Sequence, residues 1–152
     1  MRSIRSRAPA ASSAAVRRTM QSVRRDDTTA EVALRSALFR KGLRFRKNHR
    51  PVGALRIAAD IVFSRERVCV FVDGCFWHGC PKHFTPPKSN TLWWIEKITD
   101  NQVRDRKQTT QLEACGWRVI RVWEHQLVGS EVSSWATKIT RSVCARRRLT
   151  AR

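Results

Sequence analysis

The sequence has 152 residues, 41% of them hydrophobic and 28% charged, so it is long enough for one domain with a buried core but hardly for two. No apolar run approaches the roughly 20 residues that cross a bilayer, and the N-terminal stretch lacks the apolar segment of a secretory signal. The formal net charge of +19 favours a polyanionic partner such as nucleic acid, although a soluble basic protein with basic ends would carry the same excess.

Composition divides the chain into three parts. Residues 1–24 are rich in Arg, Ala and Ser and poor in core-forming residues, which predicts a flexible basic arm. Residues 25–147 carry the apolar patterns of a folded domain, and residues 148–152 are expected to form a short basic tail.

Helix signals open the folded part. Thr28 and Glu31 have the spacing of a capping box, and apolar residues follow at helical intervals up to a glycine, so we expect a helix over 29–41. A strand is expected to start at 43–45, and residues 47–54, which contain Pro and Gly, indicate a loop.

Two segments rich in β-branched and apolar residues, 57–63 and 68–72, flank a short polar turn and predict an antiparallel hairpin of buried strands. An irregular segment over 75–90 separates them from three further elements, namely a helix capped by Asn90 and ending near residue 114, a strand over 117–123 and a helix over 131–147. This order predicts an α/β domain with a small mixed central sheet flanked by helices.

Four residues have the chemistry of a zinc site. Cys75, Cys80 and His83 follow the pattern Cys-x4-Cys-x2-His, and His125 lies just past the last strand. Zinc binds such a set tetrahedrally and would hold residues 75–90 in place. Five cysteines, an odd number, favour reduced thiols over a disulfide scaffold. The alternative is that the thiols are simply buried and the histidines are surface residues.

Phosphodiester hydrolysis needs a metal and a nearby proton acceptor, and two residues fit those roles. Asp60 lies inside an apolar strand, where an acid is costly unless it is paired or binds a metal, and the alternative is a solvent-facing Asp paired with Arg56. His78 lies between the zinc candidates and is free to act elsewhere, although it could be a substitute zinc ligand or an exposed residue.

Two further acids could support that centre. Glu31 could reach it from the first helix, unless its side chain serves only the capping box. Asp73 ends the second hairpin strand and could either support the site or cap the turn that follows.

Adjacent aromatic pairs bracket the zinc segment, at residues 76–77 and 93–94. Large apolar side chains in a basic protein can stack on bases or wedge between base steps, although more often they belong to a core. Two adjacent side chains cannot easily be buried on the same face, so we expect at least one of each pair to be exposed. The tryptophans that flank the last strand, Trp117 and Trp123, and the mid-strand Cys69 are assigned to the core.

Several motifs in order along residues 17–128 resemble those of the very-short-patch repair (Vsr) DNA mismatch endonucleases. They are Met20-x-x-Val23-x-x-Asp26-x-Thr28-x-x-Glu31, Phe71-Val72-Asp73-Gly74-Cys75-Phe76-Trp77-His78-Gly79-Cys80-Pro81, Trp94-x-Glu96-Lys97, Asn101-x-x-Arg104-Asp105-Arg106 and Gly116-Trp117-Arg118-Val119-x-Arg121-Val122-Trp123-Glu124-His125.

The resemblance implies a restriction-endonuclease-like fold with a structural zinc site. It implies Mg²⁺-dependent nicking of one strand of double-stranded DNA next to the T of a G:T mismatch, the product of 5-methylcytosine deamination. It further implies a monomer without membrane association, in the bacterial cytoplasm at the nucleoid, with mismatch-repair proteins as partners.

The resemblance also assigns roles to individual residues. It makes Asp60 the Mg²⁺-binding aspartate, Val72 a Mg²⁺ ligand through its backbone carbonyl, His78 the catalytic histidine beside the attacking water, and Glu31 a neighbour of the metal's water shell. It assigns zinc to Cys75, Cys80, His83 and His125, and DNA wedging to Phe76, Trp77 and Trp94. Some members carry His where this chain has Asp73, so a catalytic role of Asp73 stays open.

Two other functions are compatible with the sequence. A restriction-type nuclease of the same fold without mismatch preference would use the same residues. A non-catalytic zinc module that binds DNA would explain the charge and the Cys/His set but not an acid inside a buried strand.

Overall fold

A four-stranded mixed sheet forms the centre of the computed structural model, which describes residues 8–11, 13–15, 17–18 and 27–150. The strands lie in the order β1-β2-β3-β4. Neighbours pair antiparallel except β3 and β4, which are parallel. The elements in chain order are α2 (Thr29–Arg40), β1 (Arg46–His49), β2 (Ala59–Phe63), β3 (Val68–Asp73), α3 (Thr91–Ala114), β4 (Arg118–Trp123) and α4 (Glu131–Thr150), with a short 3-10 helix, η1 (Glu124–Gln126), after β4.

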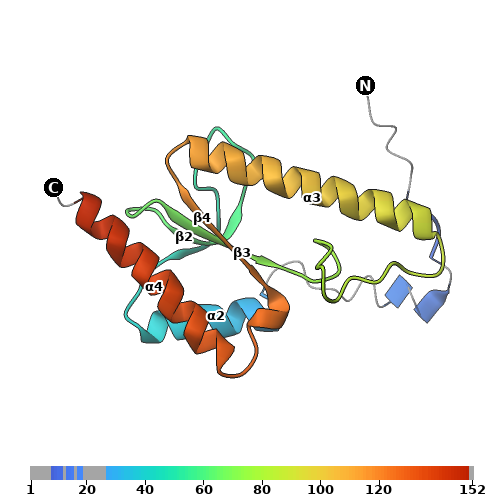
Figure 1. Cartoon of the computed structure of the whole chain (residues 1–152), viewed down its shortest axis with the longest axis horizontal. Coiled ribbons are helices and arrows are strands. Elements are labelled where there is room, and N and C mark those ends of the chain that lie inside the picture. The colour runs from blue at the N-terminus through green and yellow to red at the C-terminus, as the bar shows by residue number, and fades with distance from the viewer. Residues whose placement is uncertain (1–7, 12, 16, 19–26, 151–152) are drawn as a thin grey trace.

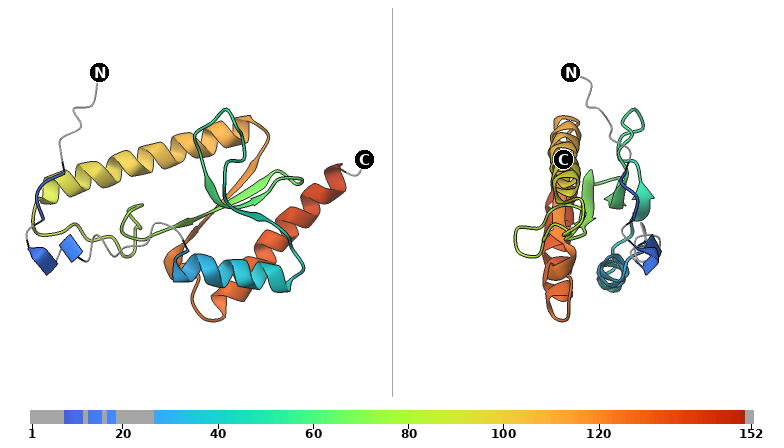
Figure 2. Two further views of the ribbon diagram at one scale, coloured as in Figure 1. Left: turned by 180° about the vertical axis from the view of Figure 1, so that it is seen from behind. Right: turned by 90° about the vertical axis from the view of Figure 1, so that its right-hand side faces the viewer.

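Helices cover both faces of the sheet, as Figures 1 and 2 show. Side chains alternate between the faces along a strand, so Ile61 and Phe63 face α2 and α4 while Val62 faces α3. Leu112, near the end of α3, belongs to the second cluster, together with Cys69 and Trp117. The two apolar layers explain the nearly continuous apolar runs of β2 and β3, and they confirm the predicted buried hairpin.

The N-terminal half of α3 extends past the sheet beside residues 75–90 (Figure 1). Those residues contain only turns and irregular backbone, as the sequence predicted. No sheet packs against this part of α3, so the protruding region needs another source of rigidity.

Strand β1 corrects the sequence prediction. A strand was expected to start at 43–45 and a loop over 47–54, but β1 is Arg46–His49. Its four residues are polar and mostly exposed, so they show no apolar alternation. Pairing with β2, such as Arg46 opposite Val62, forms this strand, and charged residues are typical of a sheet edge.

Two helix ends also differ from the prediction. Helix α4 continues to Thr150, three residues past the expected end, because no Gly or Pro interrupts the sequence there. Most of the predicted tail 148–152 is therefore helical. Asn90 is the N-cap residue of α3, but its backbone is left-handed (φ 56°) and its side chain makes no capping hydrogen bond.

The predicted basic arm lies partly outside the described residues, which omit 1–7, 12, 16 and 19–24 of it. Residues 14–15 and 17–18 are helical, and the N–H of Arg17 donates to the carbonyl of Ser13 at 3.1 Å. The division into arm, domain and tail stays a prediction. In the part of the chain that the structure describes, none of the helices combines the length and the apolar character needed to cross a bilayer.

The sheet opens at one end, and this opening positions the site. Pairing between β2 and β3 stops at Ile61 opposite Val70, whereas β3 and β4 stay paired up to Asp73 opposite Trp123. The gap between the start of β2 and the end of β3 is filled by a side chain, that of Asp60.

Candidate active site

Asp60 bridges the opening between β2 and β3. Its Oδ2 accepts a hydrogen bond from the backbone N–H of Val72 at 2.7 Å. Because β2 is an interior strand, the alternative of a solvent-facing edge Asp does not hold, and Arg56 makes no ion pair with it. The structure therefore brings Asp60 and Val72 together, as the sequence motifs implied.

Several carboxylates act on one another at this point. Burial, together with the charges of Glu31 and Asp73, raises the pKa of Asp60 to about 6, although the Val72 hydrogen bond lowers it. An acid whose charge is disfavoured by burial and by neighbouring acids is a suitable place for a cation, because a cation would relieve both effects.

Glu31 serves the helix cap, and its charge raises the pKa of Asp60. Its backbone N–H donates to the Thr28 hydroxyl at 3.3 Å, while its carboxylate accepts from that hydroxyl at 3.1 Å and from the N–H of Asp27 at 3.0 Å. The predicted reciprocal cap is present, although the backbone donor is Asp27 instead of Thr28. Glu31 is buried and also contacts Arg35 at 3.5 Å.

His78 is held by a carboxylate to which the sequence motifs gave no role. Its Nδ1 lies 2.6 Å from Oδ2 of Asp105 on α3 and 3.6 Å from Oδ1 of Asp73. Burial acts to raise the pKa of Asp105, but the hydrogen bond with His78 and the charges of His78 and Arg121 outweigh it, and this pKa is lowered. Asp105 is therefore an ionised acceptor for the imidazole.

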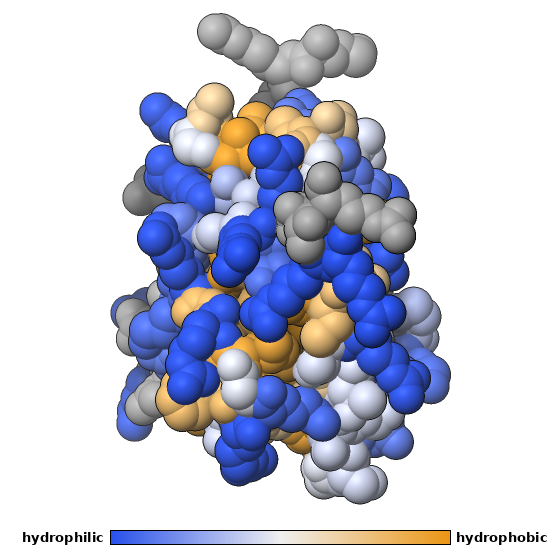
Figure 3. Space-filling view, turned by 90° about the vertical axis from the view of Figure 1, so that its left-hand side faces the viewer, coloured by the Kyte–Doolittle hydropathy of each residue, from blue (hydrophilic) through white to orange (hydrophobic). Residues whose placement is uncertain are grey.

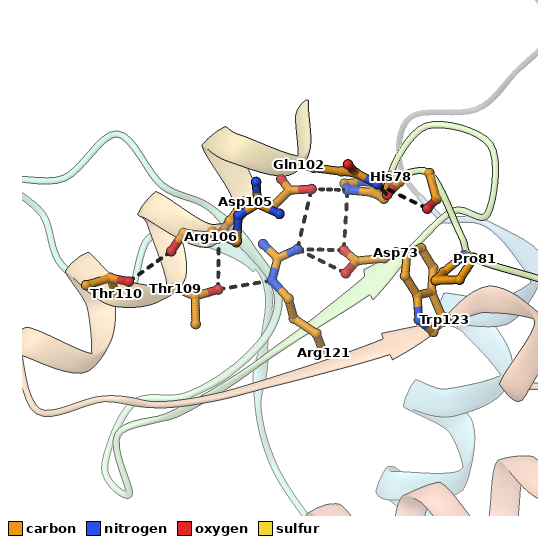
Figure 4. A pocket seen from close by; sticks show the side chains of 11 residues that line it. Asp73, His78, Pro81, Gln102, Asp105, Arg106, Thr109, Thr110, Arg121 and Trp123 are labelled. Atoms are coloured by element: carbon orange, nitrogen blue, oxygen red, sulfur yellow. Dashed lines mark hydrogen bonds and ion pairs between the residues drawn. The ribbon is translucent and has the colours of Figure 1, made fainter. Parts of the chain in front are cut away.

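Arg121 on β4 joins the two acids. Its Nη1 lies 2.9 and 3.0 Å from the two carboxylate oxygens of Asp73 and 3.8 Å from Asp105 (Figure 4). Burial raises the pKa of Asp73, and the charges of Arg121 and His78 offset this effect only in part, so the pKa stays above its usual value. These four residues line a cavity of about 550 Å³.

Helix α3 fixes the turn that carries His78. The Asn101 side-chain amide donates to the carbonyl of Trp77 at 2.9 Å, and Gln102 donates to the carbonyls of His78 and Gly79. Gly79 has φ 64°, and a Cβ there would lie 2.4 Å from the Gln102 side chain and 2.6 Å from Ile98. Only glycine fits this close approach between the turn and the helix.

The four predicted zinc ligands meet in one cluster, with all four ligand atoms within 4.8 Å of one another. Cys75 Sγ lies 3.2 Å from His125 Nδ1 and 3.9 Å from His83 Nδ1, and Cys80 Sγ lies 3.6 Å from each of these nitrogens. A tetrahedral zinc site places sulfur and nitrogen ligands about 3.6 Å apart, so the set could hold zinc.

The thiol chemistry agrees with a metal site. Burial raises the pKa of Cys75 to about 11, against a hydrogen bond at the His125 backbone that lowers it. A thiolate at Cys75 therefore needs a cation beside it. His78 is directed to Asp105, which excludes it from this cluster, and the remaining cysteines are either buried in the core (Cys69) or exposed (Cys115 and Cys144).

The predicted aromatic residues gather into one partly exposed cluster. Phe76 packs against Trp77 at 5.2 Å and Trp94 at 5.3 Å between ring centroids, and Trp77 lies 6.0 Å from Trp94. The neighbouring Leu92 is 83% exposed. Trp117 is in the core as predicted, but Trp123 is only partly buried, because it lines the cavity and stacks on His125.

Basic residues also cover the opposite end of the sheet, where β3 and β4 begin. Arg65, Arg67, Arg118 and Arg148 are exposed there, while Arg147 pairs with the buried Glu66 at 2.6 Å. Figure 3 shows this face, with strongly hydrophilic residues in deep blue around a smaller apolar area. The positive charge expected from the composition is thus spread beyond the candidate site.

Sequence reasoning missed Asp105 and Arg121. Both occur in the motif strings, but neither was given a role, since one lies on a charged helix and the other on a strand. A usable signal was available in α3, where Ile98, Asn101 and Asp105 recur at helical spacing, and the structure buries all three.

Comparisons with known proteins identify the family. The model of the DNA mismatch endonuclease Vsr family matches residues 11–83. The DNA mismatch endonuclease Vsr of Escherichia coli is 37% identical over 115 residues, which cover 75% of this chain and 72% of that protein. The chain belongs to the Vsr DNA mismatch endonuclease family. Like other members of the family, it is a DNA endonuclease.

Other Vsr relatives are named as nicking enzymes. The type II nicking enzyme V.NaeI of Lentzea aerocolonigenes is 44% identical over 128 residues, 83% of this chain and 77% of that protein. The catalytic domain of the homing endonuclease I-Bth0305I has a TM-score of 0.52 at 14% identity and covers 79% of this chain and 98% of that domain. This likeness supports the restriction-endonuclease-like fold expected from the sequence.

Proposed function

We propose that this Vsr-family endonuclease nicks one strand of DNA next to the T of a G:T mismatch by Mg²⁺-dependent hydrolysis. The observation that carries the proposal is that aromatic side chains and a histidine beside acids are neighbours in residues 76–78. Phe76 and Trp77 belong to a partly exposed aromatic cluster, and His78 directly follows them beside three acids. A base step opened by the aromatics would bring its phosphate close to His78.

Asp60 and the backbone carbonyl of Val72 would hold Mg²⁺, with Glu31 positioning its water molecules. Oxygen ligands of this kind suit Mg²⁺, and the raised pKa of Asp60 supports a cation there. When bound, Mg²⁺ would supply positive charge to the scissile phosphate and the leaving oxygen.

His78 would accept a proton from the attacking water. Nδ1 of His78 is hydrogen-bonded to the ionised Asp105, so the neutral ring carries its proton on Nδ1. Nε2 is therefore left as the proton acceptor. The water oxygen forms a bond to phosphorus, the bond from phosphorus to the leaving oxygen breaks, and the water proton passes to Nε2.

The aromatic cluster would provide the preference for a mismatch. A G:T pair costs less to unstack than a matched pair, so side chains wedged beside it distinguish the two. Phe76, Trp77 and Trp94 form this wedge, and zinc on the Cys/His cluster would hold it rigid.

A nicking assay tests the proposal. Two end-labelled duplexes that differ only in one G:T or G:C pair are incubated with Mg²⁺, wild-type protein and the Asp60→Ala variant. We expect one nick, in the T-containing strand of the mismatched duplex, made only by wild type. No nick by wild type, or an undiminished nick by the variant, would contradict the proposal, and equal cutting of both duplexes would favour a restriction-type nuclease.

The cellular setting is proposed on the same basis. We propose a monomer that works on nucleoid DNA together with mismatch-repair proteins, and the DNA mismatch endonuclease among the bacterial relatives supports the repair setting. Co-purification of repair proteins with the wild-type chain from mismatch-containing DNA would test the partnership.

A further inference from the structure

Two carboxylates lie close to the same imidazole nitrogen of His78. Asp73 and Asp105 are both buried, and both direct a carboxylate oxygen at Nδ1, at 3.6 and 2.6 Å. The ring offers one proton at Nδ1, so only one carboxylate can take it. The geometry therefore depends on what keeps Asp73 away.

Arg121 forms an ion pair with Asp73. Its Nη1 contacts both oxygens of that carboxylate, at 2.9 and 3.0 Å. The guanidinium is itself fixed, because its Nε donates to the Thr109 hydroxyl at 3.2 Å and it lies 4.5 Å over the centre of the Phe71 ring. In Figure 4, the Arg121 guanidinium reaches toward both acids, and His78 lies beside Asp105 and above Asp73.

We propose that Arg121 is a positioning residue that engages both oxygens of Asp73 and so reserves Nδ1 of His78 for Asp105. This inference rests on the proposed function, because it assigns Asp73 a role in hydrolysis only through Arg121 and His78. Without the guanidinium, Asp73 would compete for the imidazole and turn the ring away from the orientation that points Nε2 at the water.

A purely structural role of Arg121 makes a different prediction. Arg121 also ties α3 to β4 through Thr109, so its loss could simply loosen the helix. In that case a second substitution at Asp73 would add damage. In the positioning role, removing the Asp73 carboxylate would return the His78 ring to Asp105, because no second carboxylate then competes for Nδ1.

The experiment compares Arg121→Met with the double variant Arg121→Met, Asp73→Asn on the G:T duplex. Methionine keeps most of the length over Phe71 and removes the charge. We expect kcat of the single variant to fall about 10- to 100-fold with little change in KM, and the double variant to regain at least about ten-fold. Arg106→Met, which removes another cation from the same cavity, is the matched control and should change KM more than kcat.

A second readout does not need nicking. The Nδ1 proton of His78 can be followed by nitrogen-resolved NMR of the imidazoles, since the chain has only four histidines. We expect its signal to move in Arg121→Met, to return in the double variant and to be lost in Asp105→Asn. An unmoved signal in Arg121→Met, or a double variant as impaired as the single one, would overturn the proposal. If wild type does not nick at all, the proposed function fails, while this NMR test still decides the role of Arg121.

Discussion

The imidazole Nδ1 of His78 lies 2.6 Å from a carboxylate oxygen of Asp105, although 27 positions separate the two residues in the sequence. One comes from an irregular turn and the other from the middle of α3. An ionised acid at this nitrogen selects the tautomer and the orientation of the ring, as in other hydrolases that use histidine as a base.

Asp105→Asn is therefore expected to slow nicking by about 10²-fold or more, because the amide can turn its NH₂ group to the ring and favour the wrong tautomer. Single-turnover rates on the mismatched duplex measure the effect. The matched control is Asp100→Asn, an exposed acid on the same helix, which should stay close to wild type. Equal losses in the two variants would argue against the His78–Asp105 pair.

Asp60→Asn should stabilise the protein in the absence of Mg²⁺ at about pH 7.5. Burial raises the pKa of Asp60 from 3.8 to about 6, so the folded state binds this proton more tightly than the unfolded state does. The contribution of Asp60 to the free energy of unfolding then decreases as the pH rises from about 4 to 6, and above that its cost is constant, on the order of 1–3 kcal/mol.

Thermal melts of both proteins between pH 4 and 8, in buffer without Mg²⁺ or chelator, measure this difference. The gap in Tm should open between pH 4 and 6, and added Mg²⁺ should narrow it at pH 8. A gap that is the same at every pH would mean that ionised Asp60 does not cause it.

Cys80→Ser should remove bound zinc and abolish nicking. The cluster joins the irregular segment to the end of β4, and no sheet supports that segment, so its loss would misplace Trp77 and His78. Metal analysis of the purified proteins should find about one zinc per wild-type chain, as a four-ligand site predicts. Cys115→Ser, at an exposed thiol outside the cluster, is the control. Wild-type protein without zinc would disprove the ligand assignment.

Trp77→Ala should reduce nicking of the G:T duplex about ten-fold or more while changing the affinity for matched DNA much less. Stacking of one base on an aromatic ring contributes about 1–3 kcal/mol, whereas binding to matched DNA rests on phosphate contacts by the basic surface. Nicking rates and binding isotherms at one fixed salt concentration separate the two effects. An equal loss in both would point to a general binding role.

The parts of the site that depend on residue type could be predicted from the sequence. Few side chains bind zinc, so Cys75 and His125 stood out despite the 50 positions between them. Asp60 was conspicuous because an acid is rare inside an apolar strand. In both cases the unusual chemistry of the residue carried the information.

The missed features depend on pairing between distant segments. Asp105 and Arg121 are ordinary charged residues in their own elements, and only the fold brings them to His78 and Asp73. The bounds of β1 were misplaced for the same reason, since its polar sequence becomes a strand only against β2. The secondary-structure propensity of a segment does not encode its contacts with distant segments.

The zinc cluster continues the β3–β4 ladder. Asp73 and Trp123 form its last backbone pair, and the ligands Cys75 and His125 each lie two residues further on. A bound metal would therefore cross-link the ends of β3 and β4 just beyond their last backbone pair. It would also make the lengths of the two strands depend on each other. A single-residue insertion in β3 or β4 would have to be matched in the other strand to keep the ligands together.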